Sequence, residues 1–123
     1  MPVSPRALGD LRVLDCSQEL AGPFCAMLLA DMGADVVKIE PPDGDRARAM
    51  TPALAPGLSA PFSAVNRNKR SVVVDLDQSD GAALLTRFAA SADVLITNHR
   101  SGPTEDPALR YDRLSAANPR LIA

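Results

Sequence analysis

The sequence has no tryptophan, and aromatic residues make up only 3% of its 123 positions. A protein so poor in aromatic residues offers few flat surfaces on which nucleic-acid bases can stack, and its core must be built from aliphatic side chains. The net charge of −2 creates no positive field that would attract nucleic acid or an anionic membrane. We therefore expect this protein to bind neither.

Long apolar runs and clusters of metal-binding residues are missing as well. No segment approaches the roughly 18 apolar residues that a membrane span needs, and the first ten residues do not have the pattern of a signal peptide. We therefore expect a cytoplasmic protein without a membrane span. The single histidine, His99, has no cysteine or second histidine near it in the sequence. This argues against a metal site or a general base and favours a loop residue beside a cleft.

The sequence contains only two cysteines, Cys16 and Cys25. Both lie in apolar stretches, which is typical of reduced cysteines in a protein core. We expect both thiols to be buried and unreactive.

Short aliphatic runs alternate with helical patterns along the chain. We predict strands at 12–16, 35–40, 71–76 and 94–97, helices at 21–32, from 79 onward and at 108–117, and a fifth strand opening at 121–123. Segment 41–61 contains five prolines and two glycines, which predicts a long surface loop. The alternation indicates one α/β domain over residues 1–123, with a Rossmann-like, open, mostly parallel sheet.

The helix predicted at 21–32 has no polar face before Asp31, so we expect neighbouring elements to cover it on most sides. Gly33 is placed to end it. The turn before it has only one glycine, Gly22, where a dinucleotide-binding turn needs three, and this disfavours NAD binding. The start of the helix can hold a phosphate or a thioester carbonyl, or Gly22 and Pro23 can simply form the strand-to-helix turn.

Arg67, Lys69 and Arg70 form the only dense basic patch of the sequence. Such a patch either grips phosphate groups or is ordinary solvated surface charge. The aspartates that stand near strand ends and helix starts are expected to have capping roles, with no catalytic pair among them. These are Asp15, Asp31, Asp75 and Asp77.

Several segments, in the right order, resemble the start of the class III CoA-transferases (the CaiB/BaiF group). They are Leu20-Ala21-Gly22-Pro23, residues 30–42, Gly44-Asp45 with Arg48, residues 66–71 and residues 92–98. This family includes formyl-CoA transferase, carnitine CoA-transferase and α-methylacyl-CoA racemase. The resemblance covers nearly all of this chain but only about the first third of a family member. It implies the N-terminal part of the family's large domain, truncated relative to the family.

The resemblance implies an acyl-CoA and a carboxylic acid acceptor as substrates, an interlocked homodimer, and CoA as a substrate without a covalently bound cofactor. The family's nucleophilic aspartate lies beyond the matching segment, so we assign no catalytic residue and expect no turnover by this chain alone. Two alternatives stay open. One is a fragment of a racemase-type enzyme, and the other is a non-catalytic remnant that binds CoA or a partner chain.

The resemblance also implies which residues contact CoA. They are Leu20, Gly22, Val74, Asn98 and His99, with Arg48, or one of Arg46, Arg100 and Arg110, as a nearby compensating cation. Pro41 and Asp106 stand where the family has cations, and Asp77 replaces a lysine. We expect these changes to weaken binding of a polyanionic ligand, because each charge-assisted contact is worth about 1.5 to 3 kcal/mol.

Overall fold

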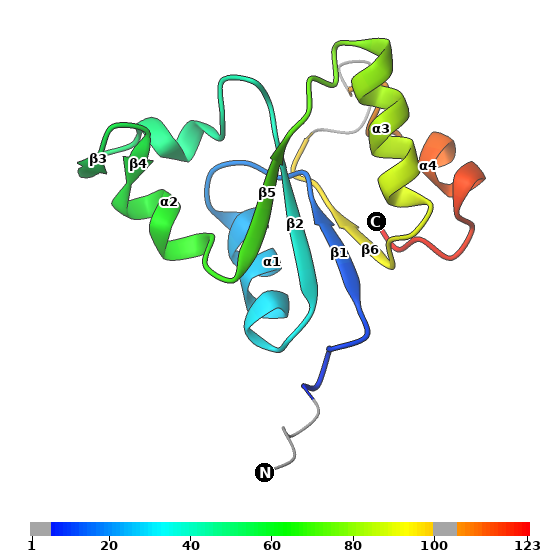
Figure 1. Ribbon diagram of the computed structural model, residues 1–123, viewed down its shortest axis with the longest axis horizontal. Coiled ribbons are helices and arrows are strands. Elements are labelled where there is room, and N and C mark those ends of the chain that lie inside the picture. The colour runs from blue at the N-terminus through cyan, green and yellow to red at the C-terminus, as the bar shows by residue number, and fades with distance from the viewer. Residues whose placement is uncertain (1–5, 100–105) are drawn as a thin grey trace.

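A computed structural model describes residues 6–99 and 106–123 of the chain. Its centre is a four-stranded sheet in the order β5-β2-β1-β6, in which all three pairings are parallel (Figure 1). The strands are β1 (Arg12–Asp15), β2 (Asp35–Glu40), β5 (Lys69–Val73) and β6 (Val94–Ile96). The predicted α/β fold with a mostly parallel sheet is therefore confirmed.

Helices cover both faces of the sheet. On one face α1 (Ala21–Asp31), which joins β1 to β2, packs Ala26 against Val13. On the other face α3 (Ser79–Ala89) and α4 (Tyr111–Ala117) contribute to a larger apolar cluster that contains Leu14. Successive side chains of a strand point to opposite faces, so Val13 packs in the cluster on the α1 face and Leu14 packs in the cluster on the other face.

The outer face of α1 carries a row of exposed apolar side chains. Spacing of four residues puts them on one side of the helix, and each is 43 to 49% exposed. This α1 stripe consists of Leu20, Phe24, Leu28 and Met32. The prediction that the helix is covered on most sides is wrong within the described residues. Cys25 is also exposed, contrary to prediction, whereas Cys16 is buried as predicted.

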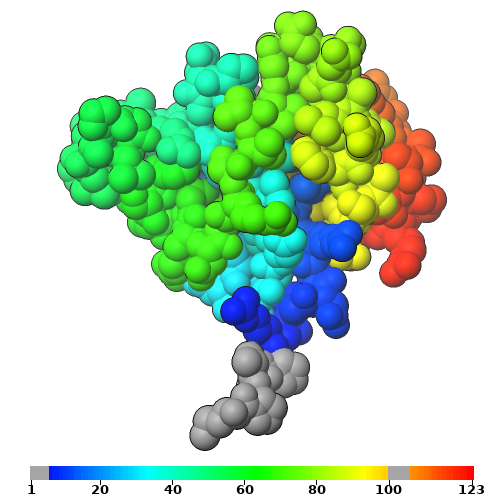
Figure 2. Space-filling view, in the orientation of Figure 1, coloured from blue at the N-terminus to red at the C-terminus, as the bar shows by residue number. Residues whose placement is uncertain are grey.

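The proline-rich segment is more regular than predicted. It contains a 3-10 helix η1 (Arg46–Ala49), an antiparallel pair formed by β3 (Ala53–Ala55) and β4 (Leu58–Ser59), and the start of α2 (Ala60–Val65). Figures 1 and 2 show it as a lobe at the side of the sheet away from α4. Asp45 caps η1 and Ser59 caps α2. Pro61 lies in the first turn of α2, where a missing N–H costs nothing. The proline content of this segment therefore did not indicate a loop at Pro61.

Several predicted boundaries shift. The third predicted strand begins two residues earlier, because Lys69 and Arg70 pair in register with Val36 and Val37 of β2 despite their charge, and it ends three residues earlier, at Val73. The last helix begins three residues later, at Tyr111. The end of the chain forms one parallel bridge, Ile122 to Val94, instead of a strand. No helix among the described residues has the length and apolar character required to cross a membrane.

Candidate functional site

The carboxyl ends of the four parallel strands meet at one edge of the sheet and border a cavity of about 290 Å³. The loops after all four strands contribute to its lining. Asp106, the first residue of the second described range, lines it as well. The chain leaves β1 toward α1 on one face, and after β6 it continues toward α4 on the other. The cavity therefore opens beside a reversal of connection between neighbouring strands, which is where open α/β sheets bind ligands.

The wall of the cavity is acidic. Its carboxylates are Asp43, Asp75, Asp77 and Asp106. Asp75 accepts a hydrogen bond from the Asp77 N–H at 3.1 Å, and Asp106 accepts one from the Ala108 N–H at 2.8 Å. Such a wall repels phosphate groups and suits neutral parts of a ligand or groups that donate hydrogen bonds.

The buried residue Cys16 also lines the cavity. Burial, reinforced by the neighbouring Asp15 carboxylate, raises the pKa of this thiol far above its usual range. The thiolate is the nucleophilic form of cysteine, so Cys16 is a packing residue and not a nucleophile.

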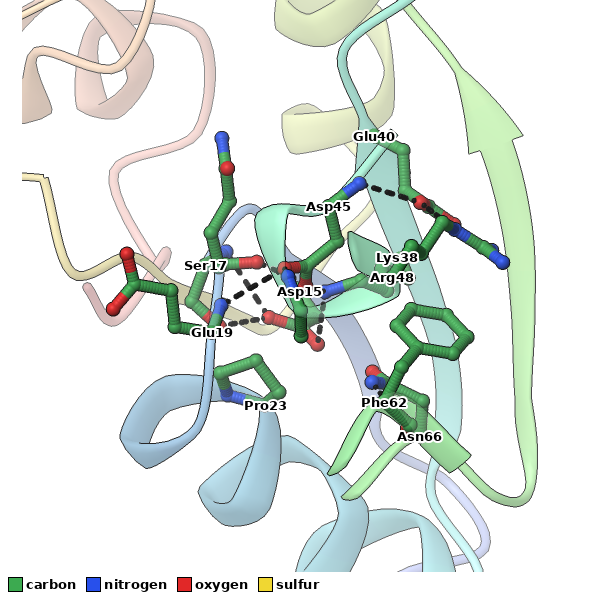
Figure 3. Close-up of polar contacts among 12 residues, drawn as sticks. Asp15, Ser17, Glu19, Pro23, Lys38, Glu40, Asp45, Arg48, Phe62 and Asn66 are labelled. Atoms are coloured by element: carbon green, nitrogen blue, oxygen red, sulfur yellow. Dashed lines mark hydrogen bonds and ion pairs between the residues drawn. The ribbon is translucent and has the colours of Figure 1, made fainter. Parts of the chain in front are cut away.

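The turn that links β1 to α1 is held by side chains from several elements (Figure 3). In this β1–α1 turn, residues 17–19, the Ser17 N–H bonds to Asp15 and the Ser17 carbonyl accepts from Lys38 Nζ at 2.9 Å. The Glu19 N–H donates to Asp45 Oδ1 at 2.9 Å. Both backbone groups of the residue between them, Gln18, bond to Asn98. Each of these backbone groups is therefore paired with a side chain.

Gly22 lets the β1–α1 turn pack directly on the first turn of α1. A Cβ at this position would overlap the Cβ and Oγ atoms of Ser17, which is fully buried. The glycine is thus required by close approach of two segments, and the predicted strand-to-helix turn accounts for it.

Beneath this turn lies a buried network of four charged side chains, Asp15, Lys38, Asp45 and Lys69. Lys38 Nζ lies 2.7 Å from Asp45 and 3.8 Å from Asp15, and Lys69 Nζ lies 2.8 Å from Asp15. Burial lowers the pKa of Lys69, and the hydrogen bond to Asp15 opposes that shift. With two cations and two anions, the network keeps its charges balanced away from water.

The basic patch predicted at residues 67–70 is divided between this network and the surface. Lys69 belongs to the buried network, Arg67 pairs with Asp31 at 2.6 Å, and Arg70 pairs with Asp35 at 2.8 Å. Arg67 and Arg70 are exposed surface charges that pair with carboxylates, as one of the two predicted alternatives has it, whereas the side chain of Lys69 is buried.

Arg48 is engaged as well. Its Nε and Nη2 atoms bond to the two oxygens of Glu40 at 2.7 and 2.8 Å, and its guanidinium lies 3.8 Å from the ring centre of Phe62. Burial pushes the pKa of Glu40 upward, but hydrogen bonds from Arg48, Ser71 and the Asp45 N–H outweigh it and lower the pKa to about 2. Arg48 thus ties the lobe to β2.

The structure brings only part of the predicted site together. Val74 and His99 line the cavity, as do the residues expected to weaken binding, Pro41, Asp77 and Asp106. Leu20 is half exposed on the α1 stripe, and Gly22, Arg48 and Asn98 make the contacts described above. Sequence reasoning missed Gln18 in the lining and Lys38 in the buried network. The signal for the second was a lysine flanked by valine and isoleucine within a strand.

Comparisons with known proteins match nearly the whole chain. The model of the CoA-transferase family III matches residues 8–123. The chain is 45% identical over 120 residues to the succinyl-CoA:mesaconate CoA-transferase of Haloarcula hispanica, covering 94% of this chain and 30% of that protein. It is 42% identical over 129 residues to the succinate–glutarate CoA-transferase of Agrobacterium fabrum, covering 99% of this chain and 32% of that protein.

Solved structures of the same family match this chain in fold as well. A crystal structure of a CaiB/BaiF family protein from Brucella suis matches with a TM-score of 0.86 and 40% identity, over 94% of this chain and 32% of that one. The chain therefore spans about a third of the length of the relatives that it matches.

Proposed function

The chain belongs to CoA-transferase family III, and from this we propose that it is the N-terminal portion of an acyl-CoA transferase, which moves CoA from an acyl-CoA thioester to a carboxylic acid. The observation that carries the proposal is the family match over residues 8–123. The relatives reported above are named as CoA-transferases, which does not favour the racemase alternative. In this proposal residues 1–123 form one Rossmann-like unit that contributes part of the CoA site. The cytoplasmic location stays a prediction.

We assign the cavity at the strand ends to a neutral part of CoA. Val74 and Leu76 offer apolar contact there, and His99 adds a polar ring. The acidic wall disfavours the diphosphate inside the cavity but suits groups that donate hydrogen bonds, such as the amides of the pantetheine arm. The first turn of α1 has no side-chain cap, and because Pro23 has no N–H, the N–H groups of Ala21 and Gly22 are the ones that we assign to an anionic group of the ligand.

Changing Asp77 to lysine is the sharpest test of this assignment. The side chain lines the cavity and is exposed, so the charge reversal removes repulsion of the CoA phosphate groups that remain outside the cavity, without disturbing the core. We expect Asp77→Lys to tighten CoA binding about fivefold, as an exposed charge contact of about 1 kcal/mol would. Isothermal titration calorimetry at constant ionic strength measures it.

Asp80→Lys is the matched control, because it makes the same charge change on an exposed residue in the first turn of α3. We expect it to change CoA affinity less than twofold. Equal effects of the two variants, or no tightening by Asp77→Lys, would contradict the assignment of the cavity to CoA. Titration with NAD in place of CoA is expected to give no binding.

A homodimer is part of the proposal, and the α1 stripe supports it. Exposed apolar side chains that form a continuous row mark surfaces of association. We expect the protein to sediment as a dimer at micromolar concentration and Phe24→Lys to shift it to monomer. Leu54→Lys, at a 60% exposed position in β3, is the control and should leave the dimer intact. A monomeric wild-type protein would refute the dimer.

A further inference from the structure

We propose that Asn98 is a positioning residue that locks the β1–α1 turn to the loop after β6 and so shapes the wall of the cavity. The proposal rests on the proposed function, because it concerns the same CoA site. It assigns Asn98 a different role from the direct CoA contact implied by the family resemblance.

The hydrogen bonds of Asn98 carry the argument. Its Oδ1 accepts from the Gln18 N–H at 3.0 Å, and its Nδ2 donates to the Gln18 carbonyl at 2.7 Å. One side-chain amide thus pairs with both backbone groups of one residue, in the manner of a neighbouring strand. The two residues are 80 positions apart in the sequence. The amide is already committed to holding two distant loops together.

The position of this clamp connects it to ligand binding. β1 and β6 are neighbours in the sheet, and the chain leaves them toward opposite faces, so their loops would otherwise diverge. Gln18 on one loop and His99 on the other both line the cavity. Asn98 joins these loops beside the crevice in which open α/β sheets bind their ligands. Its two hydrogen bonds therefore fix the width of the cavity on this side.

The conformation of the turn explains why a clamp is needed. Glu19 has φ of +69°, in the left-handed region that non-glycine residues adopt only when the surroundings enforce it. Asp45 and Lys38 hold the turn from below through the Glu19 N–H and the Ser17 carbonyl. These two side chains are buried in the charged network, whereas Asn98 is exposed. Asn98 is therefore the residue whose removal loosens the turn while the core stays intact.

The test compares local opening, ligand affinity and global stability in Asn98→Ala. We expect exchange of the Gln18 amide hydrogen, measured by NMR without ligand, to accelerate about tenfold, because the Gln18 N–H and the Gln18 carbonyl both lose their hydrogen bond to Asn98. CoA affinity, measured by calorimetry, should fall about fivefold. The urea midpoint of global unfolding should stay near the wild-type value. Asn98→Asp keeps an acceptor for the Gln18 N–H, so it should restore protection of that amide.

Gln78→Ala is the control, since it removes an exposed side-chain amide at the same edge of the sheet. It should change neither amide exchange at Gln18 nor CoA affinity. Unchanged exchange in Asn98→Ala would overturn the clamp, and faster exchange with unchanged affinity would overturn its role in positioning. If the wild-type protein fails to bind CoA, the proposed function is refuted, and the exchange measurement still decides whether Asn98 holds the turn.

Discussion

Replacing Lys69 with methionine is expected to destabilise the protein by about 3 to 5 kcal/mol, the usual effect of removing one partner from a buried ion pair. The Lys69 side chain is only 1% exposed. Its Nζ donates to Asp15, to the Pro23 carbonyl and to Asn66, each at 2.8 Å. Without it, Asp15 and Asp45 share the single cation Lys38, and an uncompensated negative charge stays buried. The free energy of unfolding from urea denaturation measures the effect.

Two further variants isolate the cause. Asp15→Asn combined with Lys69→Met leaves Lys38 opposite Asp45, so the network is neutral again and part of the lost stability should return. Arg70→Met removes a neighbouring cation whose side chain is 70% exposed in its pair with Asp35, and it should cost less than about 1 kcal/mol. If Lys69→Met costs no more than Arg70→Met, the buried network does not stabilise the fold.

The sheet could be predicted from the sequence because each strand has a recognisable local pattern of aliphatic residues. Aliphatic runs at residues 12–16 and 35–40, separated by an apolar helix, are enough to indicate parallel strands. The lobe was missed because its short helices depend on individual capping residues, which composition does not reveal. Asp45 caps η1 and Ser59 caps α2. Local patterns therefore predicted the frame but not the lobe attached to it.

The site was only partly predictable for a different reason. Lys69 was interpreted as part of a surface patch because its partner, Asp15, is 54 positions away. Asn98 was interpreted as a ligand contact from the family resemblance, and its hydrogen bonds to Gln18, 80 positions away, could not be predicted from the sequence. Val74 and His99 were named from the family resemblance, and both line the cavity because the chain segments that follow parallel strands meet at one edge of the sheet. Position along a strand is visible in a single sequence, whereas pairing between distant side chains is not.

Gly81→Ala is expected to destabilise the protein by about 2 to 3 kcal/mol, although helix propensity alone would favour alanine by about 1 kcal/mol. Gly81 lies in the first turns of α3, where a Cβ would overlap the carbonyl oxygen of Asp75 and lie 2.7 Å from its carbonyl carbon. These are backbone atoms, which cannot rotate away as a side chain can. The relief available is movement of the loop after β5 away from α3, which gives up part of the native packing.

That movement should also change the shape of the cavity, because the same loop supplies Val74, Asp75 and Leu76 to its lining. We expect Gly81→Ala to shift the NMR signals of these residues and to weaken CoA binding together with the loss of stability. Gly9→Ala is the control, since its Cβ would meet the nearest atom, the Arg6 carbonyl oxygen, only at 3.4 Å. Its stability should stay within about 0.5 kcal/mol of wild type, as for ordinary surface substitutions. A Gly81→Ala protein as stable as wild type would mean that propensity outweighs the clash, and that α3 does not hold this loop in place.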